Sequence, residues 1–125
     1  MPVRSLTEAL PAAWTRGEIS VLGLARSGRA AAELLRRAGA DVYASDAGTG
    51  DAVDHAATAL EKLGVALQRG GHDLVRIAKS ALVVASPGIP PDAPPLAAAR
   101  DAKVPIVGEL EVALHFLPHQ RYVAI

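Results

Sequence analysis

Short apolar runs alternate along this chain with longer segments that carry apolar residues at helical spacing. The run "EISVLGL" (18–24) is followed by "SGRAAAELLRRAGA" (27–40), in which apolar residues recur every three or four positions. The first pattern predicts a buried strand and the second an amphipathic helix. A further short strand, "DVYASD" (41–46), in which Val42 and Ala44 alternate, completes a strand, helix and strand unit.

The same alternation continues through the rest of the chain. Three more helix-like segments lead into short apolar runs: "AVDHAATALEKLG" before "VALQRG", "DLVRIAKS" before "ALVVASPG", and "APPLAAARDAK" before "VPIVG". This order is typical of a parallel sheet with right-handed crossovers. We therefore expect an α/β fold, a Rossmann-like parallel sheet of about five strands with helices on both faces. The proline-dense stretch "SPGIPPDAPP" (86–95) is predicted to be a rigid loop.

Composition and charge narrow the class of protein. The 125 residues suit one domain, and the 3% of aromatic residues favours an aliphatic core. Thirteen basic and thirteen acidic residues give a formal net charge of zero, and neither sign forms a run along the sequence. The sequence therefore shows no basic segment suited to nucleic acid or an anionic membrane. The absence of cysteine excludes disulfides and thiolate chemistry. With Arg4 and Glu8 interrupting any signal-like segment, we expect a cytoplasmic monomer with neither nucleic acid nor membrane as a partner.

The turn "GLARSG" joins the first predicted strand to the first predicted helix. Gly23 permits a tight exit from the strand, and Gly28 lets the helix pack closely on the sheet. Such a turn offers backbone N–H groups and a helix N-terminus to a phosphate, beside Arg26 and Ser27. Ala25 stands where dinucleotide-binding enzymes have glycine, at the closest approach of the pyrophosphate. This methyl group weakens the case for a dinucleotide, whereas a phosphate lying further out, over Arg26 and Ser27, still fits.

Two other strand ends are predicted at the same edge of the sheet. Asp46 ends the second strand 18 residues after Gly28 (46 − 28), a spacing suited to a carboxylate that accepts from a ribose or a base N–H. An aspartate that only caps a loop fits this position equally well. In "ASPGIP" (85–90), Ser86 offers a hydroxyl and Gly88 allows close backbone approach, with a plain proline turn as the alternative.

The chain carries no evident catalytic machinery or metal site. It has neither a nucleophile elbow nor a Gly-x-x-x-x-Gly-Lys loop. His115 and His119 are four residues apart, but Pro118 interrupts the helix that would align them, so we expect no metal ion. Glu109 and Glu111 fall in the first turn of a predicted helix, where their charges complement the helix dipole.

Several motifs together resemble the N-terminal domain of the Mur ligase family. They are "VLGLARSG" followed by "ASD", then "LVVASPGIPPDAPPLAAARDAKVPIVGELEVA", and finally "YVAI". The resemblance covers the chain from Glu18, and "ASPGI" followed by "VPIVGELE" is its most specific part. It is nearest to the branch that adds D-glutamate, with the L-alanine-adding branch as the nearest alternative. It implies a domain that binds the UDP moiety of UDP-N-acetylmuramoyl-L-alanine.

The resemblance also implies which residues face the nucleotide. The turn from Gly23 to Gly28 would face the diphosphate and uridine, with Arg26 and Ser27 supplying backbone N–H groups, and Asp46 would recognise the uracil edge. Ala25 lies within this turn and Ala47 follows Asp46, while Ser86, Pro87 and Gly88 would flank the nucleotide from the third strand end. Ala47 and Gly48 stand where some members have a hydroxyl and an arginine, and we hypothesise that Arg26 compensates through its guanidinium.

The end of the sequence, "RYVAI", looks like the start of another strand. In Mur ligases the matching strand leads into a Gly-rich ATP loop, so the resemblance implies that residues 1–120 are the UDP-binding domain and 121–125 the first strand of a missing central ATPase domain. The full-length enzyme would use ATP and Mg²⁺ to join D-glutamate to its UDP-linked substrate. This fragment would hold no cofactor and be inactive alone. The alternative is a C-terminal edge strand of a complete domain.

Two other classes of function share the same first turn. One is an NAD(P)-binding domain of an oxidoreductase, in which Asp46 would hold the ribose 2′-hydroxyl; Ala25 counts against it. The other is a non-catalytic nucleotide-sensing domain. Binding of NADH or of UDP separates the first of these from the Mur ligase interpretation.

Overall fold

The computed structural model describes residues 10–116, which form alternating strands and helices. A 3₁₀ turn, η2 (Ala12–Thr15), precedes the first strand. The strands are β1 (Ile19–Leu22), β2 (Val42–Asp46), β3 (Ala66–Arg69), β4 (Leu82–Ala85) and β5 (Ile106–Gly108). The helices are α1 (Arg26–Arg37), α2 (Asp51–Glu61), α3 (Leu74–Ala78), α4 (Pro94–Asp101) and α5 (Glu109–His115). The predicted elements are confirmed with small shifts at their ends, and residues 86–93 form the predicted loop between β4 and α4.

The five strands form one parallel sheet in the order β3-β2-β1-β4-β5. β1 lies in the centre, and its Val21 is in register with Ala44 of β2 on one side and Val84 of β4 on the other. From β1 the chain first adds β2 and β3 on one side of the sheet, and then crosses back to add β4 and β5 on the other side. The carboxyl end of β1 is therefore the topological switch point, where open α/β sheets bind their ligands.

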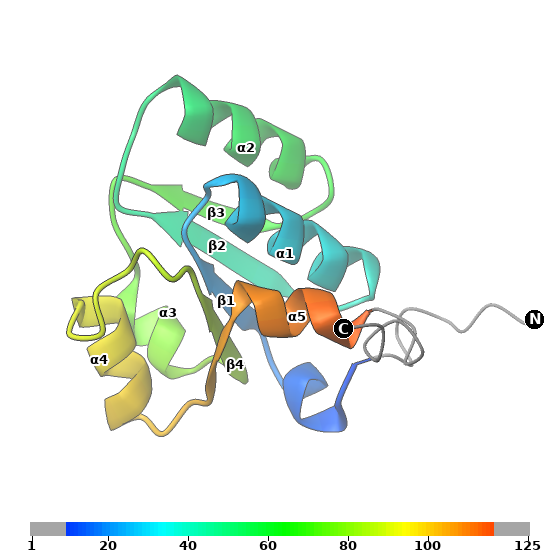
Figure 1. The fold of residues 1–125 in the computed structure, drawn as a ribbon, viewed down its shortest axis with the longest axis vertical. Coiled ribbons are helices and arrows are strands. Elements are labelled where there is room, and N and C mark those ends of the chain that lie inside the picture. The colour runs from blue at the N-terminus through cyan, green and yellow to red at the C-terminus, as the bar shows by residue number, and fades with distance from the viewer. Residues whose placement is uncertain (1–9, 117–125) are drawn as a thin grey trace, which may run out of the picture.

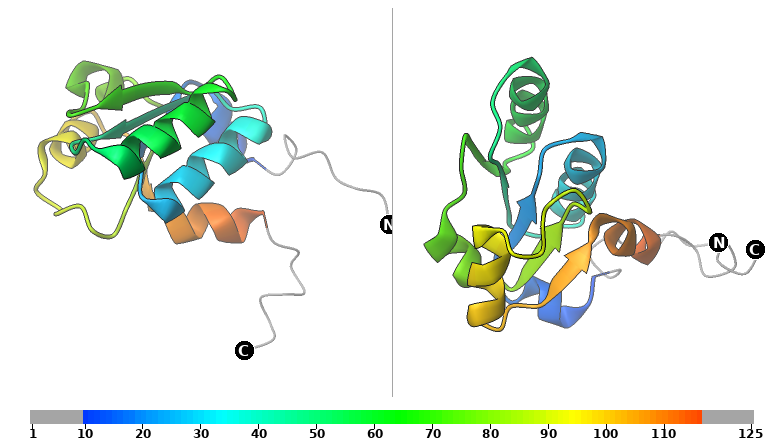
Figure 2. Two further views of the ribbon diagram at one scale, coloured as in Figure 1. Left: turned by 90° about the horizontal axis from the view of Figure 1, so that it is seen from above. Right: turned by 60° about the vertical axis from the view of Figure 1, so that its left-hand side comes forward.

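Helices cover both faces of the sheet, as the sequence predicts. Figure 1 and the right-hand view of Figure 2 show α1, α2 and α5 on one face and α3 and α4 on the other. The core under α1, α2 and α5 is built largely of alanine, valine and leucine, and a smaller core containing Leu22, Tyr43 and Ile77 lies under α3 and α4. Because both faces are covered, Tyr43 and Ser45 are buried as fully as Val42 and Ala44, and the alternation in β2 does not mark a solvated face.

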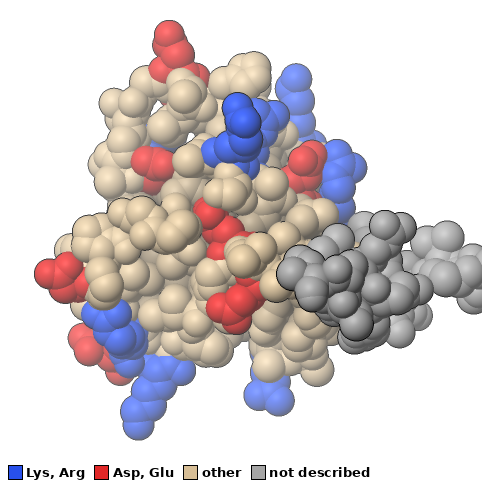
Figure 3. All heavy atoms as spheres, in the orientation of Figure 1, with Lys and Arg blue, Asp and Glu red and all other residues tan. Residues whose placement is uncertain are grey.

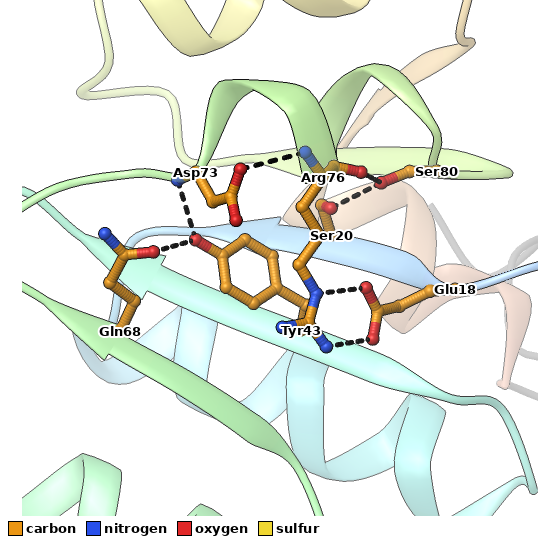
Figure 4. Close-up of polar contacts among 7 residues, drawn as sticks. All are labelled: Glu18, Ser20, Tyr43, Gln68, Asp73, Arg76 and Ser80. Carbon is orange, nitrogen blue, oxygen red and sulfur yellow. Dashed lines mark hydrogen bonds and ion pairs between the residues drawn. The ribbon is translucent and has the colours of Figure 1, made fainter.

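A polar network lies under α3 (Figure 4). The Tyr43 hydroxyl donates to Oε1 of Gln68 at 2.6 Å and accepts from the Asp73 backbone N–H at 2.9 Å. The Arg76 guanidinium lies 4.6 Å from the centre of the Tyr43 ring and binds both carboxylate oxygens of Glu18 at 2.7 Å. These contacts fasten α3 to the central strands.

The strand predicted at 121–125 lies outside the described residues, and the division of the chain at residue 120 stays a prediction. Among residues 10–116, no helix is long and apolar enough to cross a membrane.

Candidate functional site

The turn between β1 and α1 depends on its two glycines. Gly23 has φ +108°, a conformation that favours glycine, and its N–H donates to the Ser45 carbonyl at 2.7 Å. A Cβ atom on Gly28 would lie 2.1 Å from the Gly23 carbonyl oxygen and 2.8 Å from Oε2 of Glu109. Gly28 therefore allows α1 to pack directly against the turn, which confirms the role predicted for it.

The N-terminus of α1 opens at this turn without a side-chain cap. Ala25 is the N-cap residue, with extended backbone (φ −68°, ψ 175°), and its methyl group cannot accept a hydrogen bond. Arg26, Ser27 and Gly28 are the first residues of the helix, where backbone N–H groups have no acceptor within the helix. This arrangement favours an anion at the turn.

Asp46, at the end of β2, fixes the shape of the turn. Its Oδ2 accepts from the Leu24 N–H at 2.7 Å, and its Oδ1 accepts from the Gly48 N–H at 2.7 Å. The bond with Gly48 caps the loop, which is one of the two roles that the sequence left open for Asp46. The bond with Leu24 connects the end of β2 to the residues that follow β1. Ala47 follows in the loop and is exposed. Contact of Asp46 and Ala47 with a ligand remains a prediction.

The segment after β3 packs beside the end of β2. The Gly71 N–H donates to the Asp46 carbonyl at 3.1 Å, and the Ser45 hydroxyl lies 2.6 Å from Nδ1 of His72. Burial lowers the pKa of His72 below its ordinary value, although the nearby Asp46 carboxylate raises it. The end of β2 is thus held against the segment that follows β3 as well as against the turn that follows β1.

The end of β4 lies beside the first turn, as predicted. Ser86 donates its N–H to the Leu22 carbonyl at 3.4 Å, and its Cβ would contact a Cβ placed on Gly23 at 3.4 Å. Pro87 and Gly88 follow and are exposed, and the Gly88 N–H donates to the Ser86 hydroxyl at 3.4 Å. The structure therefore brings the ends of β1, β2 and β4 together at one edge.

A cavity of about 560 Å³ lies between the first turns of α1 and α2. Its lining includes Ala25 and Arg26, together with Arg29, Asp51 and His55. Neither guanidinium group has a hydrogen bond or ion pair with any residue in the described range 10–116. Two unpaired guanidinium groups beside a free helix N-terminus make this side of the turn suited to a phosphate.

A second cavity, of about 520 Å³, lies on the other side of α1, against α5. Ser27, Pro87 and Glu109 contribute to its otherwise mainly apolar lining. Ser27 donates its hydroxyl to Oε1 of Glu109 at 2.6 Å. Asp46, Ala47, Ser86 and Gly88 line neither cavity.

Sequence reasoning missed three residues of this region. Arg29 lies on the same face of α1 as Arg26, and their spacing of three residues was the available signal. His55 comes from α2, and no local motif relates it to the turn. Glu109 was assigned only to the dipole of its own helix, whereas its side chain is buried against α1. Glu111 does serve its own helix, because its Oε1 accepts from the Gly108 N–H at 3.1 Å.

The charges around the site are local rather than part of a broad patch. On the face drawn in Figure 3, positive and negative side chains are scattered over a mainly uncharged surface. Over residues 10–116, no group of three or more histidine, aspartate or glutamate side chains could hold a metal ion.

Comparison with known proteins identifies the family. Residues 17–108 match the model of the Mur ligase MurD-like N-terminal domain. The chain is 43% identical over 100 residues to a UDP-N-acetylmuramoylalanine--D-glutamate ligase of Acidobacterium capsulatum, which covers 80% of this chain and 22% of that protein. It is 44% identical over 99 residues to the enzyme of the same name from Anaeromyxobacter dehalogenans, covering 79% and 21%.

Solved structures agree with the sequence matches. A UDP-N-acetylmuramate-alanine ligase MurC from Thermotoga maritima superposes with a TM-score of 0.63 at 27% identity, over 77% of this chain and 21% of that one. A pseudomurein peptide ligase type C from Methanothermus fervidus shares the fold, with a TM-score of 0.67 at 24% identity over 82% and 21%. The chain thus spans about a fifth of the length of the relatives it matches. This chain belongs to the Mur ligase family, and its residues 17–108 correspond to the MurD-like N-terminal domain.

Proposed function

We propose that this domain binds the UDP moiety of UDP-N-acetylmuramoyl-L-alanine for an ATP-dependent ligase that adds D-glutamate. The observation that carries the proposal is the uncapped first turn of α1, beside a cavity of about 560 Å³. Arg26 and Arg29 line this cavity, and their guanidinium groups have no partner in residues 10–116. A diphosphate would accept from the free N–H groups and the guanidinium groups. The names of the relatives support the choice of nucleotide.

Each part of the site has a separate task in this proposal. The N–H groups of Arg26 and Ser27 bind the diphosphate, and Asp46 accepts from the uracil edge with lone pairs that Leu24 and Gly48 leave free. Ser86, Pro87 and Gly88 flank the nucleotide from the end of β4.

The chemistry of amide formation belongs to other parts of the longer enzyme. In the proposed reaction ATP phosphorylates the substrate carboxylate, and the D-glutamate amine attacks the acyl phosphate; Mg²⁺ supplies charge neutralisation when bound. The described part of this chain lacks a cluster of metal-ligating side chains, so we assign no step of that transfer to it. Its own contribution is to hold the UDP-linked substrate.

Calorimetric titration of the 125-residue chain with UDP and with NADH tests the proposal. We expect saturable binding of UDP and none of NADH at the same concentrations. Ala25 places a methyl group where a dinucleotide pyrophosphate comes nearest to the backbone. Binding of NADH in preference to UDP would instead support an oxidoreductase domain, and absence of both would contradict a nucleotide site at this turn.

A further inference from the structure

Glu109 is a buried carboxylate that is only half paired. It is the first residue of α5, directly after β5, and 6% of its surface is exposed. Its Oε1 accepts from the Ser27 hydroxyl at 2.6 Å, whereas its Oε2 is buried and has no hydrogen-bond partner within residues 10–116. A carboxylate removed from water is costly unless its oxygens are paired. This cost points to a role beyond holding Ser27.

The carboxylate lies against the part of α1 that would receive the diphosphate. Ser27, which it binds, and Gly28, whose missing Cβ leaves room for Oε2 at 2.8 Å, are the second and third residues of the helix. An anion on the N–H groups of these residues would lie close to Glu109, because its carboxylate binds Ser27 and approaches Gly28. The carboxylate therefore acts directly on the charge of whatever binds there.

The two sides of α1 present opposite charges to such an anion. Arg26 and Arg29 line the cavity toward α2, together with Asp51 and His55. Among the described residues, Glu109 is the one charged residue that lines the cavity toward α5. The Ser27 hydroxyl on that side donates its hydrogen bond to Glu109. Because a hydroxyl has one hydrogen to donate, it cannot also donate to a phosphate oxygen.

We propose that Glu109 is a specificity-determining residue that favours nucleoside diphosphates esterified at the outer phosphate over free nucleoside diphosphates. This inference rests on the proposed function. Above its second pKa, which is about 6, a terminal phosphate carries one more negative charge than an esterified one. Glu109 repels that extra charge, at a cost on the order of tenfold in affinity. Free UDP shares the nucleoside and both phosphates with this ligand and would otherwise compete with it.

The test compares UDP with its β-methyl ester, which removes the extra charge and adds almost nothing else. Both are titrated at about pH 8, where the terminal phosphate is ionised, into the wild-type chain and into Glu109→Gln. Glutamine keeps an oxygen that accepts from Ser27 and lacks the charge. We expect the ratio of the Kd of UDP to the Kd of the ester to fall by about tenfold in this variant.

Glu111→Gln is the matched control. Glu111 lies in the same turn of α5 and undergoes the same change of charge, but it is exposed and binds the Gly108 N–H. We expect its ratio of dissociation constants to equal that of the wild type. Glu109→Met, which is neutral and similar in length, is a second variant in case Glu109→Gln folds poorly. Urea unfolding of each variant shows that the titrations report folded protein.

The outcomes separate this inference from the proposed function. If the wild type binds both ligands and neither neutral variant at Glu109 changes their ratio, the selectivity role is wrong while the UDP site stands. Loss of folding in both variants would give Glu109 a structural role and would also overturn the proposal. If the wild type binds neither ligand, the proposed function itself fails.

Discussion

The polar network lies on the face of the sheet that α3 covers, whereas the turn between β1 and α1 lies at the carboxyl edge of the same sheet. Under α3, the Tyr43 hydroxyl is paired with Gln68 and the Asp73 N–H, and the Arg76 guanidinium is paired with Glu18 (Figure 4). The Ser20 and Ser80 hydroxyls form a further buried hydrogen bond between β1 and the segment after α3. At the turn, the first N–H groups of α1, two arginine side chains and one carboxylate oxygen lack partners within residues 10–116.

This difference separates polar groups that hold the fold from those available to a ligand. Paired polar groups contribute to stability because the desolvation of each is compensated by its partner. Unpaired polar groups cost stability where they are buried, as Oε2 of Glu109 is, whereas an exposed side chain such as Arg26 is solvated and stays available to a ligand. We therefore expect substitutions under α3 to alter stability without changing the affinity for UDP, and substitutions at the turn to change that affinity.

The largest expected effect comes from Gly28→Ala, at the turn. The new Cβ would lie 2.1 Å from the Gly23 carbonyl oxygen, which belongs to the backbone and cannot rotate away. We expect a loss of about 3 kcal/mol or more in the free energy of unfolding, measured in urea, together with loss of UDP binding.

Gly17→Ala is the control for this substitution. The nearest atom to a Cβ at Gly17 is 3.7 Å away, an ordinary contact, so we expect a change of about 0.5 kcal/mol or less. A Gly28→Ala protein as stable as the wild type would mean that the turn and α1 are not packed as described.

Tyr43→Phe is expected to have a smaller effect, confined to stability. It removes the hydroxyl between Gln68 and the Asp73 N–H and keeps the ring under Arg76. We expect a loss of about 1–2 kcal/mol in the free energy of unfolding, while calorimetry with UDP gives an unchanged Kd. Thr58→Val, which removes an exposed hydroxyl, is a control with little expected effect on either. A weakened Kd in Tyr43→Phe would show that the two regions are coupled.

Much of the fold could be predicted from the sequence because its signals are local. Each strand is a short apolar run, and each longer helix carries apolar residues at helical spacing. The spacing of Gly23 and Gly28 alone marks the turn between the first strand and the first helix. The parallel arrangement of the strands and the helices on both faces followed from general rules for α/β sheets, whereas the order of the strands was not predicted. The burial of Tyr43 and Ser45 was less apparent, because covering both faces of a strand depends on helices distant in sequence.

The site was predictable only in part, for the same reason. The first turn, Asp46 and Ser86 were placed at one edge because parallel strands end together. Three contacts each join residues from different parts of the fold: the Leu24 N–H donates to Asp46, the Ser27 hydroxyl donates to Glu109, and His55 lines the same cavity as Arg26. No local pattern encodes such contacts, since each depends on how two elements pack.

The most direct test of the account is the effect of Arg26→Ala on the binding of UDP and of uridine. Arg26 is exposed and has no partner in residues 10–116, so its removal should leave the free energy of unfolding unchanged within about 0.5 kcal/mol. Arg37→Ala, at the other end of α1, is the matched control. We predict that Arg26→Ala weakens UDP binding by about tenfold and leaves uridine binding unchanged. An unchanged Kd for UDP in a folded Arg26→Ala protein would contradict the assignment of this turn to the diphosphate.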